Sequence, residues 1–247
     1  MIFGRKIPCG NRNFHRGFCF MNTSDSNFFG TEKVSRILLK IAPPVMLAQL
    51  IQALYNIVDS LFVGKYSESG LTALSIIYPL QLLMIAIAVG TGVGINTAVA
   101  HYLGVHDEKK ANEYGGIGTP LTLVLWVLFA LICFLFMPAY ARMSTDSPEV
   151  IKDVIVYGRI VCVFSIGLFT ESIWTKILQA NGDMRTPMIA QIVGALVNIA
   201  LDPLFIFGMF GLPKLGIAGA AIATVVGQIV AALIVMRKGF CKSPQLS

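Results

Sequence analysis

Residues 49–59 read Gln49-Leu-Ile-Gln52-Ala-Leu-Tyr-Asn56-Ile-Val-Asp59 and lie inside a long apolar segment. The polar side chains Gln49, Gln52, Asn56 and Asp59 recur at steps of three, four and three, so a helix places them on one face. A carboxylate beside amides in a segment long enough to cross a bilayer is costly, and such residues usually face a protein interior or a watery cavity. The alternative is that Asp59 reaches the lipid headgroups from the helix end, and the neighbouring amides argue against it.

The composition indicates an integral membrane protein. Apolar residues make up 55% of the chain and charged residues only 13%, and the charges are separated by long neutral runs. Helices of about 20 such residues span a bilayer. The sequence therefore predicts an all-α integral membrane protein. The runs without Asp, Glu, Lys or Arg are 69–102, 114–141, 186–201 and 215–236.

Six transmembrane helices are expected. The pair Pro43-Pro44 removes two backbone donors near the start of the first helix and predicts a bend there. We expect a disordered basic tail over 1–36, a six-helix unit over 37–238 and a short cytoplasmic tail over 239–247. The predicted helices cover 37–63, 71–100, 117–138, 154–178, 187–209 and 215–236.

The orientation follows from the distribution of Lys and Arg, which concentrate on the cytoplasmic side of membrane proteins. Most of them fall in the tails and in alternate connections of the predicted topology. Both termini are therefore expected in the cytoplasm, with the chain in the cytoplasmic membrane. The basic residues on the inner side include Lys109, Lys110, Lys176, Arg185, Arg237, Lys238 and Lys242.

Metal, cofactor and nucleic-acid binding are not indicated. The five cysteines have no CxxC spacing and no nearby His cluster, so neither a zinc site nor a disulfide framework is predicted. The net charge of +6 would suggest nucleic acid only if the basic residues grouped on a folded domain, and here they flank membrane segments. We expect the lipid bilayer as the surroundings, no cofactor and no nucleic-acid partner.

Polar residues of three predicted helices share a depth in the membrane. Asp59 is about 7 Å below the outer end of its helix, and Asp202, which shares a helix face with Asn198, is about 10 Å below. Thr224 lies about 14 Å down the sixth helix, with Gln228 on the same face.

Two carboxylates without a Lys or Arg at their depth suit a small cation. Oxygen ligands bind sodium-like ions, and a carboxyl group removed from water also binds a proton more readily. The alternative is that Asp202 ends its helix before Pro203 and Asn198 only bonds to a neighbouring helix.

Other residues carry weaker signals. Glu171 could face a substrate or be neutralised by Lys176 at the inner surface, and Trp126 could face lipid or core. Glycines and alanines at small-xxx-small spacings predict close helix packing. A cavity lining is one of two readings for Tyr55, Tyr78, Gln81 and Met84. The small residues are Gly90, Gly92, Gly94, Gly216, Gly219, Ala220, Ala223 and Gly227.

Four segments between about 35 and 238 together resemble the multidrug and toxic compound extrusion family, usually called MATE. The first helix carries Pro44 and Gln52-Ala-Leu-Tyr-Asn-Ile-Val-Asp59-Ser-Leu-Phe-Val-Gly64. The other three segments are Leu178-Gln-Ala-Asn-Gly182-Asp183-Met-Arg185-Thr-Pro187, Asn198-Ile-Ala-Leu-Asp202-Pro-Leu-Phe-Ile-Phe-Gly208 and Gly216-Ile-Ala-Gly-Ala-Ala-Ile-Ala-Thr224.

The resemblance implies an antiporter that is driven by protons or sodium and exports lipophilic, often cationic drugs or toxins. By motif, its cation site would comprise Asp59, Asn198, Asp202 and Thr224. Ion binding would bend the first helix near Pro44 and reshape a cavity. The residues expected at that cavity or gate are Pro44, Gln52, Tyr55 and Asn56.

The family has twelve helices in two lobes, whereas this sequence predicts one lobe of six. We expect a truncated product, a fragment, or a lobe that pairs with another copy; its expected partners are the missing lobe and amphiphilic small molecules. A lipid-linked saccharide flippase is an alternative. Its cavity would need positive charge for the diphosphate of its substrate, and Arg159 is the single Lys or Arg at mid-membrane depth. A membrane-embedded enzyme is disfavoured because helix interiors lack His, and a non-transporting lobe is the last alternative.

Overall fold

The computed structural model describes residues 34–208 and 213–242, and this part of the chain is helical throughout. Among these described residues, five helices are long and apolar enough to cross a membrane, and the pair α5–α6 would make a sixth span. The predicted all-α membrane fold is confirmed. The helices are α2 (Val34–Tyr66), α3 (Glu68–Gly104), α4 (Glu108–Ser144), α5 (Pro148–Val163), α6 (Ile166–Ala180), α7 (Arg185–Phe207) and α8 (Ile217–Lys242).

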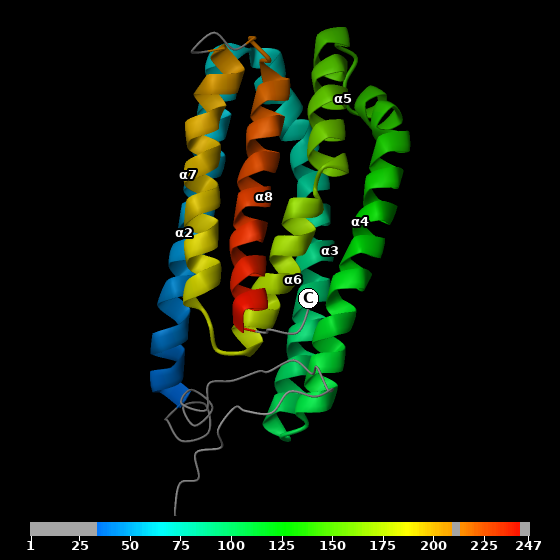
Figure 1. The fold of residues 1–247 in the computed structure, drawn as a ribbon. Helices are drawn as coiled ribbons and strands as arrows, with labels where there is room; N and C mark the ends of the chain where they lie inside the picture. Colours follow the sequence, from blue (N-terminus) through cyan, green and yellow to red (C-terminus); the bar gives the residue numbers. More distant parts are fainter. Residues whose placement is uncertain (1–33, 209–212, 243–247) are drawn as a thin grey trace, which may run out of the picture.

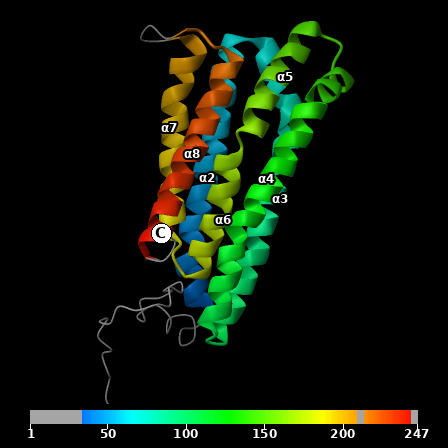
Figure 2. The ribbon, with the colours of Figure 1, turned by 45° about the vertical axis from the view of Figure 1, so that its right-hand side comes forward.

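The helices run back and forth along one axis (Figure 1, turned by 45° in Figure 2). We call the end with the α2–α3 and α7–α8 connections the upper end, and the end with the α3–α4 and α6–α7 connections the lower end. The start of α2 and the end of α8 both lie at the lower end. The predicted tails lie mostly outside the described residues.

Two helices, α3 and α4, are longer than the apolar segments from which they were predicted, and each begins at a polar capping residue. Ser67 accepts a hydrogen bond from the amide of Gly70 (3.3 Å) at the start of α3, and Asp107 accepts one from Lys110 (3.1 Å) at the start of α4. α3 and α4 each have 37 residues, or about 55 Å at about 1.5 Å per residue. Since the bilayer core is about 30 Å thick, their ends extend beyond it.

α2 runs from Val34 to Tyr66 through Pro43 and Pro44, so the proline pair does not interrupt it. α2 packs mainly on α7. Its opposite side carries exposed apolar side chains. They are Met46, Leu47, Leu50, Leu54, Ile57 and Leu61.

The fourth span is broken, and the expectation of one helix over 154–178 was wrong. α5 ends at Val163 and α6 begins at Ile166, with a bend of 41° between them. Ser165 donates to the carbonyl of Cys162 (2.7 Å), and the indole of Trp126 on α4 donates to the carbonyl of Val163 (3.1 Å). These side chains satisfy carbonyls that the helix no longer uses, which makes a break tolerable in a membrane.

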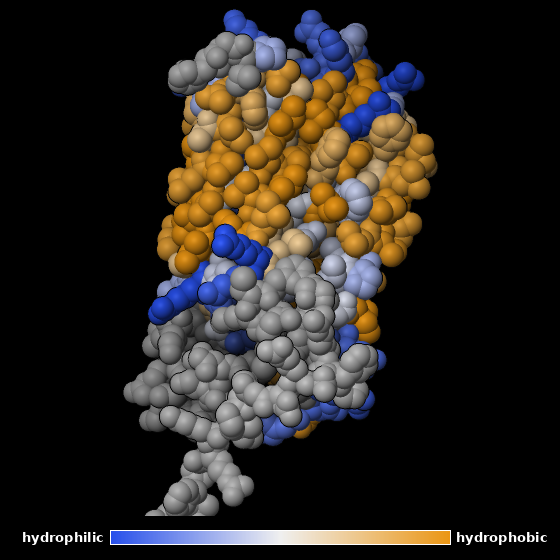
Figure 3. Space-filling view, in the orientation of Figure 1, coloured by the Kyte–Doolittle hydropathy of each residue, from blue (hydrophilic) through white to orange (hydrophobic). Residues whose placement is uncertain are grey.

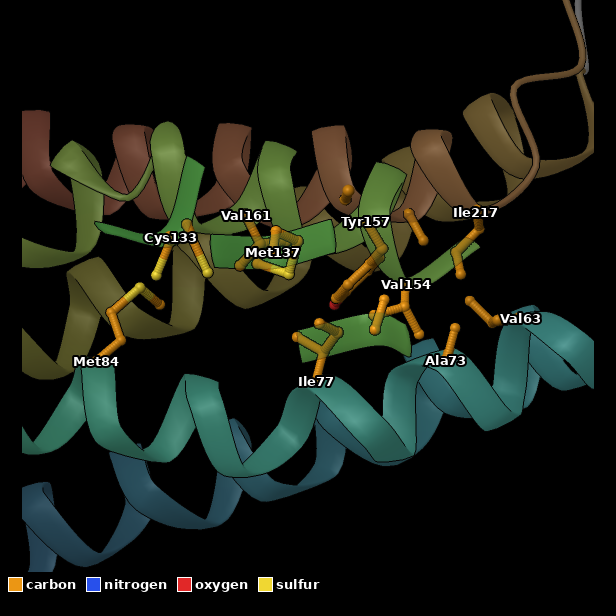
Figure 4. Packing of buried hydrophobic residues seen from close by; sticks show 14 of the residues in the cluster. Val63, Ala73, Ile77, Met84, Cys133, Met137, Val154, Tyr157, Val161 and Ile217 are labelled. Carbon is orange, nitrogen blue, oxygen red and sulfur yellow. The ribbon is translucent and has the colours of Figure 1, made fainter. Parts of the chain in front are cut away.

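The apolar core lies between α3, α4 and α5 and continues to α8. Figure 4 shows Met84 and Ile77 of α3 facing Cys133 and Met137 of α4, with Tyr157 of α5 among them. Outside, hydrophobic residues cover the middle of the visible face and hydrophilic residues gather at the upper end (Figure 3).

Glycines set the closest helix approach. A Cβ added at Gly227 of α8 would lie 2.7 Å from the carbonyl oxygen of Gly194 on α7. Similar crowding surrounds Gly92, against Lys176, and Gly219, against the backbone of Phe205. The packing prediction is confirmed there. It was wrong for Gly90 and Gly94, where an added Cβ would meet nothing within 4 Å.

Candidate functional site

The four residues predicted to bind a cation are buried on three neighbouring helices. Relative exposure is 6% for Asp59 on α2, 2% for Asn198 and 0% for Asp202 on α7, and 7% for Thr224 on α8. α7 packs against both α2 and α8, which brings these helices together from separate parts of the chain.

A hydrogen-bonded pair joins two of these residues. The amide nitrogen of Asn198 donates to the Thr224 hydroxyl (3.4 Å), which itself donates to the carbonyl of Ala220 (3.0 Å). The side-chain oxygen of Asn198 is left without a partner among the described residues. This oxygen is therefore free to accept a proton donor or to face a cation.

The carboxyl groups are similarly unsatisfied. Within the described residues, one oxygen of Asp59 and both oxygens of Asp202 are buried without a hydrogen-bond partner. The two side chains belong to helices that pack against each other, α2 and α7. Buried polar atoms in native proteins are almost always satisfied, so orphaned carboxyl oxygens are compatible with a bound proton or cation.

The donor set favours a light, oxygen-seeking ion. Two carboxyl groups, an amide oxygen and a hydroxyl offer the hard ligands that such ions prefer. The described residues contain no group of three or more His, Cys, Asp or Glu side chains that could hold a metal ion.

Asp59 and Thr224 line an outer cavity of about 310 Å³ between α2, α3, α5, α6 and α8. Gln52, Tyr55 and Asn56 also line it. Tyr55, Tyr78, Gln81 and Met84, for which a cavity lining was one of two readings, all belong to this lining. Asp202 is not part of the lining, although the sequence placed it at the same depth as the others.

A small cavity of about 80 Å³ adjoins the same residues. Asn198, Thr224 and Gln228 line it from α7 and α8, and Gln52 and Glu171 line it from α2 and α6. Asn198 therefore faces a different space from Asp59, while Thr224 lines both.

An inner cavity of about 180 Å³ lies toward the lower end. Pro44, Gln49, Glu171, Lys176 and Met184 are among the residues that line it. The polar face predicted on the first helix is thus divided, because Gln49 lines the inner cavity while Asn56 and Asp59 line the outer one.

Glu171 is satisfied by uncharged donors. Its carboxylate accepts from the hydroxyl of Thr175 (2.8 Å) and from the amide of Gln191 on α7 (3.4 Å). Lys176 donates to Gln179 (3.2 Å), and no ion pair joins it to Glu171 in the described part of the chain. Neutralisation of Glu171 by a direct contact with Lys176 is therefore not observed.

Tyr157 and Leu168 are among the cavity residues that escaped sequence reasoning. Tyr157 is buried on α5, accepts from the amide of Gln81 (3.3 Å) and lines the outer cavity. Leu168 lines all three cavities. No sequence signal marks either residue, because a tyrosine or leucine in an apolar segment is ordinary.

Arg159 does not line any of the three cavities. Its guanidinium lies 4.8 Å from the ring centroid of Phe134 on α4. The positive charge that a diphosphate-binding cavity would require is therefore not supplied by this residue.

Comparisons with known proteins agree on a family. Residues 44–204 match the profile of the family described as MatE. The probable multidrug resistance protein YoeA of Bacillus subtilis strain 168 is 32% identical over 194 residues, which cover 78% of this chain and 42% of that protein. The FAD transporter of Shewanella oneidensis is 27% identical over 201 residues, which cover 80% of this chain and 44% of that one.

Solved structures show the same relation. The outward-facing conformation of a multidrug resistance MATE family transporter of the MOP superfamily matches with a TM-score of 0.75 at 27% identity, over 81% of this chain and 43% of that one. This chain accordingly spans about half the length of the relatives that it matches.

Proposed function

The chain belongs to the MATE family of transporters, and on that premise we propose that it forms the N-terminal lobe of a cation-coupled antiporter. The exported compounds are lipophilic and often cationic drugs or toxins, and the membrane crossed is the cytoplasmic membrane. A second six-helix lobe, in the same polypeptide or in another copy, supplies the opposite wall of the passage. As a member of a transporter family, the chain is not an enzyme.

The observation that carries this proposal is the unsatisfied carboxyl pair Asp59 and Asp202 beside the Asn198–Thr224 hydrogen bond. A proton or a sodium ion at this site would satisfy oxygens that are otherwise buried alone. The outer cavity reaches Asp59 directly, so an ion there can influence what the cavity holds.

Coupling would act through α2. Gln52 lines all three cavities, and Tyr55 and Asn56 line the outer one. Pro44 lies about two turns below Gln52 and lines the inner cavity. Because a proline leaves a carbonyl of the preceding turn unpaired, α2 can bend at this point when Asp59 binds its ion.

The lower end is assigned to the cytoplasm. The starts of α4 and α7 and the last turns of α8 carry Lys109, Lys110, Arg185, Arg237 and Lys238, and they lie at this end. A concentration of Lys and Arg marks the cytoplasmic side of membrane proteins. Both termini are then cytoplasmic.

The test uses the product of the complete gene in energised membrane vesicles that export a fluorescent cationic dye. Asp59→Asn and Asp202→Asn are expected to abolish efflux driven by an imposed proton or sodium gradient. Asp153→Asn is the matched control. The Asp153 carboxylate accepts a hydrogen bond from the Ser69 hydroxyl (2.8 Å), and Asp153 lines none of the three cavities. Unchanged efflux in both site variants would rule out the cation site.

A further inference from the structure

The three cavities form a series along the inside of the lobe. The outer cavity contains Asp59, the inner cavity contains Glu171, and the small cavity shares Thr224 with the first and Glu171 with the second. Gln52 and Leu168 line every one of them. Polar side chains therefore follow one another from the upper half of the lobe to the α6–α7 connection.

Glu171 is a second carboxylate in this series, and the cation site does not use it. Thr175 and Gln191 each donate one hydrogen bond to the same oxygen of Glu171. The side chain lines both the small cavity and the inner cavity. A carboxylate within a membrane span usually marks an ion or substrate pathway.

Leu168 is the apolar residue that lines all three cavities, and Ile85 of α3 lines the outer and inner ones. Leu168 lies at the start of α6, directly after the break in the fourth span. Its neighbour Gly167 fixes this start against α8, because an added Cβ would lie 2.8 Å from the backbone nitrogen of Ile229. A hydrophobic side chain at a narrow point between polar spaces excludes water and so closes the way to ions.

We propose that a cation path runs inside this lobe, from the inner cavity through Glu171 to the Asp59–Asp202 site, and that Leu168 closes it. The path rests on the cation site proposed above and carries the same ion, a proton or sodium. It provides the site with a connection to the lower end that is separate from the passage between the lobes. The closure at Leu168 prevents ions from crossing without an exported compound.

The experiment measures ion leak without any exported compound. The product of the complete gene is reconstituted in liposomes, and a proton gradient or radioactive sodium is applied in separate arms. Leu168→Ala is expected to raise the passive flux of the coupling ion several-fold over the wild-type protein. Phe164→Ala is the matched control, since Phe164 also lies at the break, is 56% exposed and lines none of the three cavities.

A second substitution separates the path from a general loss of packing. Leu168→Ala combined with Glu171→Gln is expected to return the flux to the wild-type rate, because the path then lacks its carboxylate. Leu168→Asn keeps the number and branching of the side-chain heavy atoms while making the side chain polar, and it should leak as Leu168→Ala does if the alanine variant folds poorly. A flux no greater than that of Phe164→Ala, or one that Glu171→Gln leaves unchanged, would overturn the path.

The two proposals fail separately. If Leu168 variants leak through Glu171 while Asp59→Asn leaves dye efflux intact, the path through Glu171 and Leu168 stands, and its end at a coupling-ion site falls together with the coupled export. If Asp59→Asn abolishes efflux while Leu168 variants do not leak, the exporter stands and the path falls.

Discussion

The side-chain nitrogen of Asn198 on α7 donates to the hydroxyl of Thr224 on α8 across 3.4 Å. This contact is possible because Gly194 and Gly227 let the two helix backbones approach closely, one turn away along α7. The site and the packing of its helices are thus parts of one arrangement. Thr224→Val alters the site, whereas Gly227→Ala alters the packing of the helices.

Thr224→Val removes the hydroxyl and keeps the shape of the side chain. We expect cation affinity to fall by about 1 kcal/mol, roughly fivefold, because one hydrogen-bonding oxygen is lost. The measurement is a sodium or proton titration of the purified protein. Thr224→Ser should retain the wild-type affinity, and equal affinity in Thr224→Val would exclude the hydroxyl from the site.

Gly227→Ala should force α8 away from α7. The new Cβ would lie 2.7 Å from the carbonyl oxygen of Gly194 and 3.2 Å from the Cβ of Asn198, and backbone cannot give way cheaply. We expect a loss of about 1–3 kcal/mol in the free energy of unfolding, measured by melting in detergent. The control is Gly90→Ala, where the space is open and replacing glycine within a helix should be neutral or stabilising by up to about 1 kcal/mol. Equal melting of the two variants would contradict the packing account.

Trp126→Phe should weaken the junction of α5 and α6. The substitution removes the indole donor to the carbonyl of Val163 and leaves that carbonyl without this partner. We expect a loss of about 1 kcal/mol in the free energy of unfolding. The control is Val127→Ala at the exposed neighbouring position. A melting temperature as high as that of the wild-type protein would show that the bond does not stabilise the break.

Cysteine labelling tests the proposed orientation. In a background without the five native cysteines, Asp146→Cys at the upper end should react with an impermeant maleimide in intact cells. Lys109→Cys at the lower end should react only after the membrane is opened. Both native side chains are exposed, so accessibility within the protein does not decide the result. The reverse pattern would place the termini outside the cytoplasm.

The membrane class, the five unbroken spans and most of the cavity residues on α2 could be predicted from the sequence. Hydropathy is summed over consecutive residues, and helix periodicity places Gln52, Asn56 and Asp59 on related faces without reference to any partner. The motifs around Asp59, Asn198 and Asp202 also led to the family, since they are contiguous stretches of chain.

Only the tertiary structure decided how these side chains are distributed. Helix neighbours determine that Thr224 bonds to Asn198, that Asp202 is not part of the cavity lining, and that Glu171 bonds to Gln191 rather than Lys176. At the break before Ile166, the hydrogen bond to the carbonyl of Val163 likewise comes from Trp126 on another helix. Local sequence determines which segments enter the membrane, because the bilayer acts on each segment separately. Contacts between segments determine the site, because they depend on the closest approach that residues such as Gly194 and Gly227 permit.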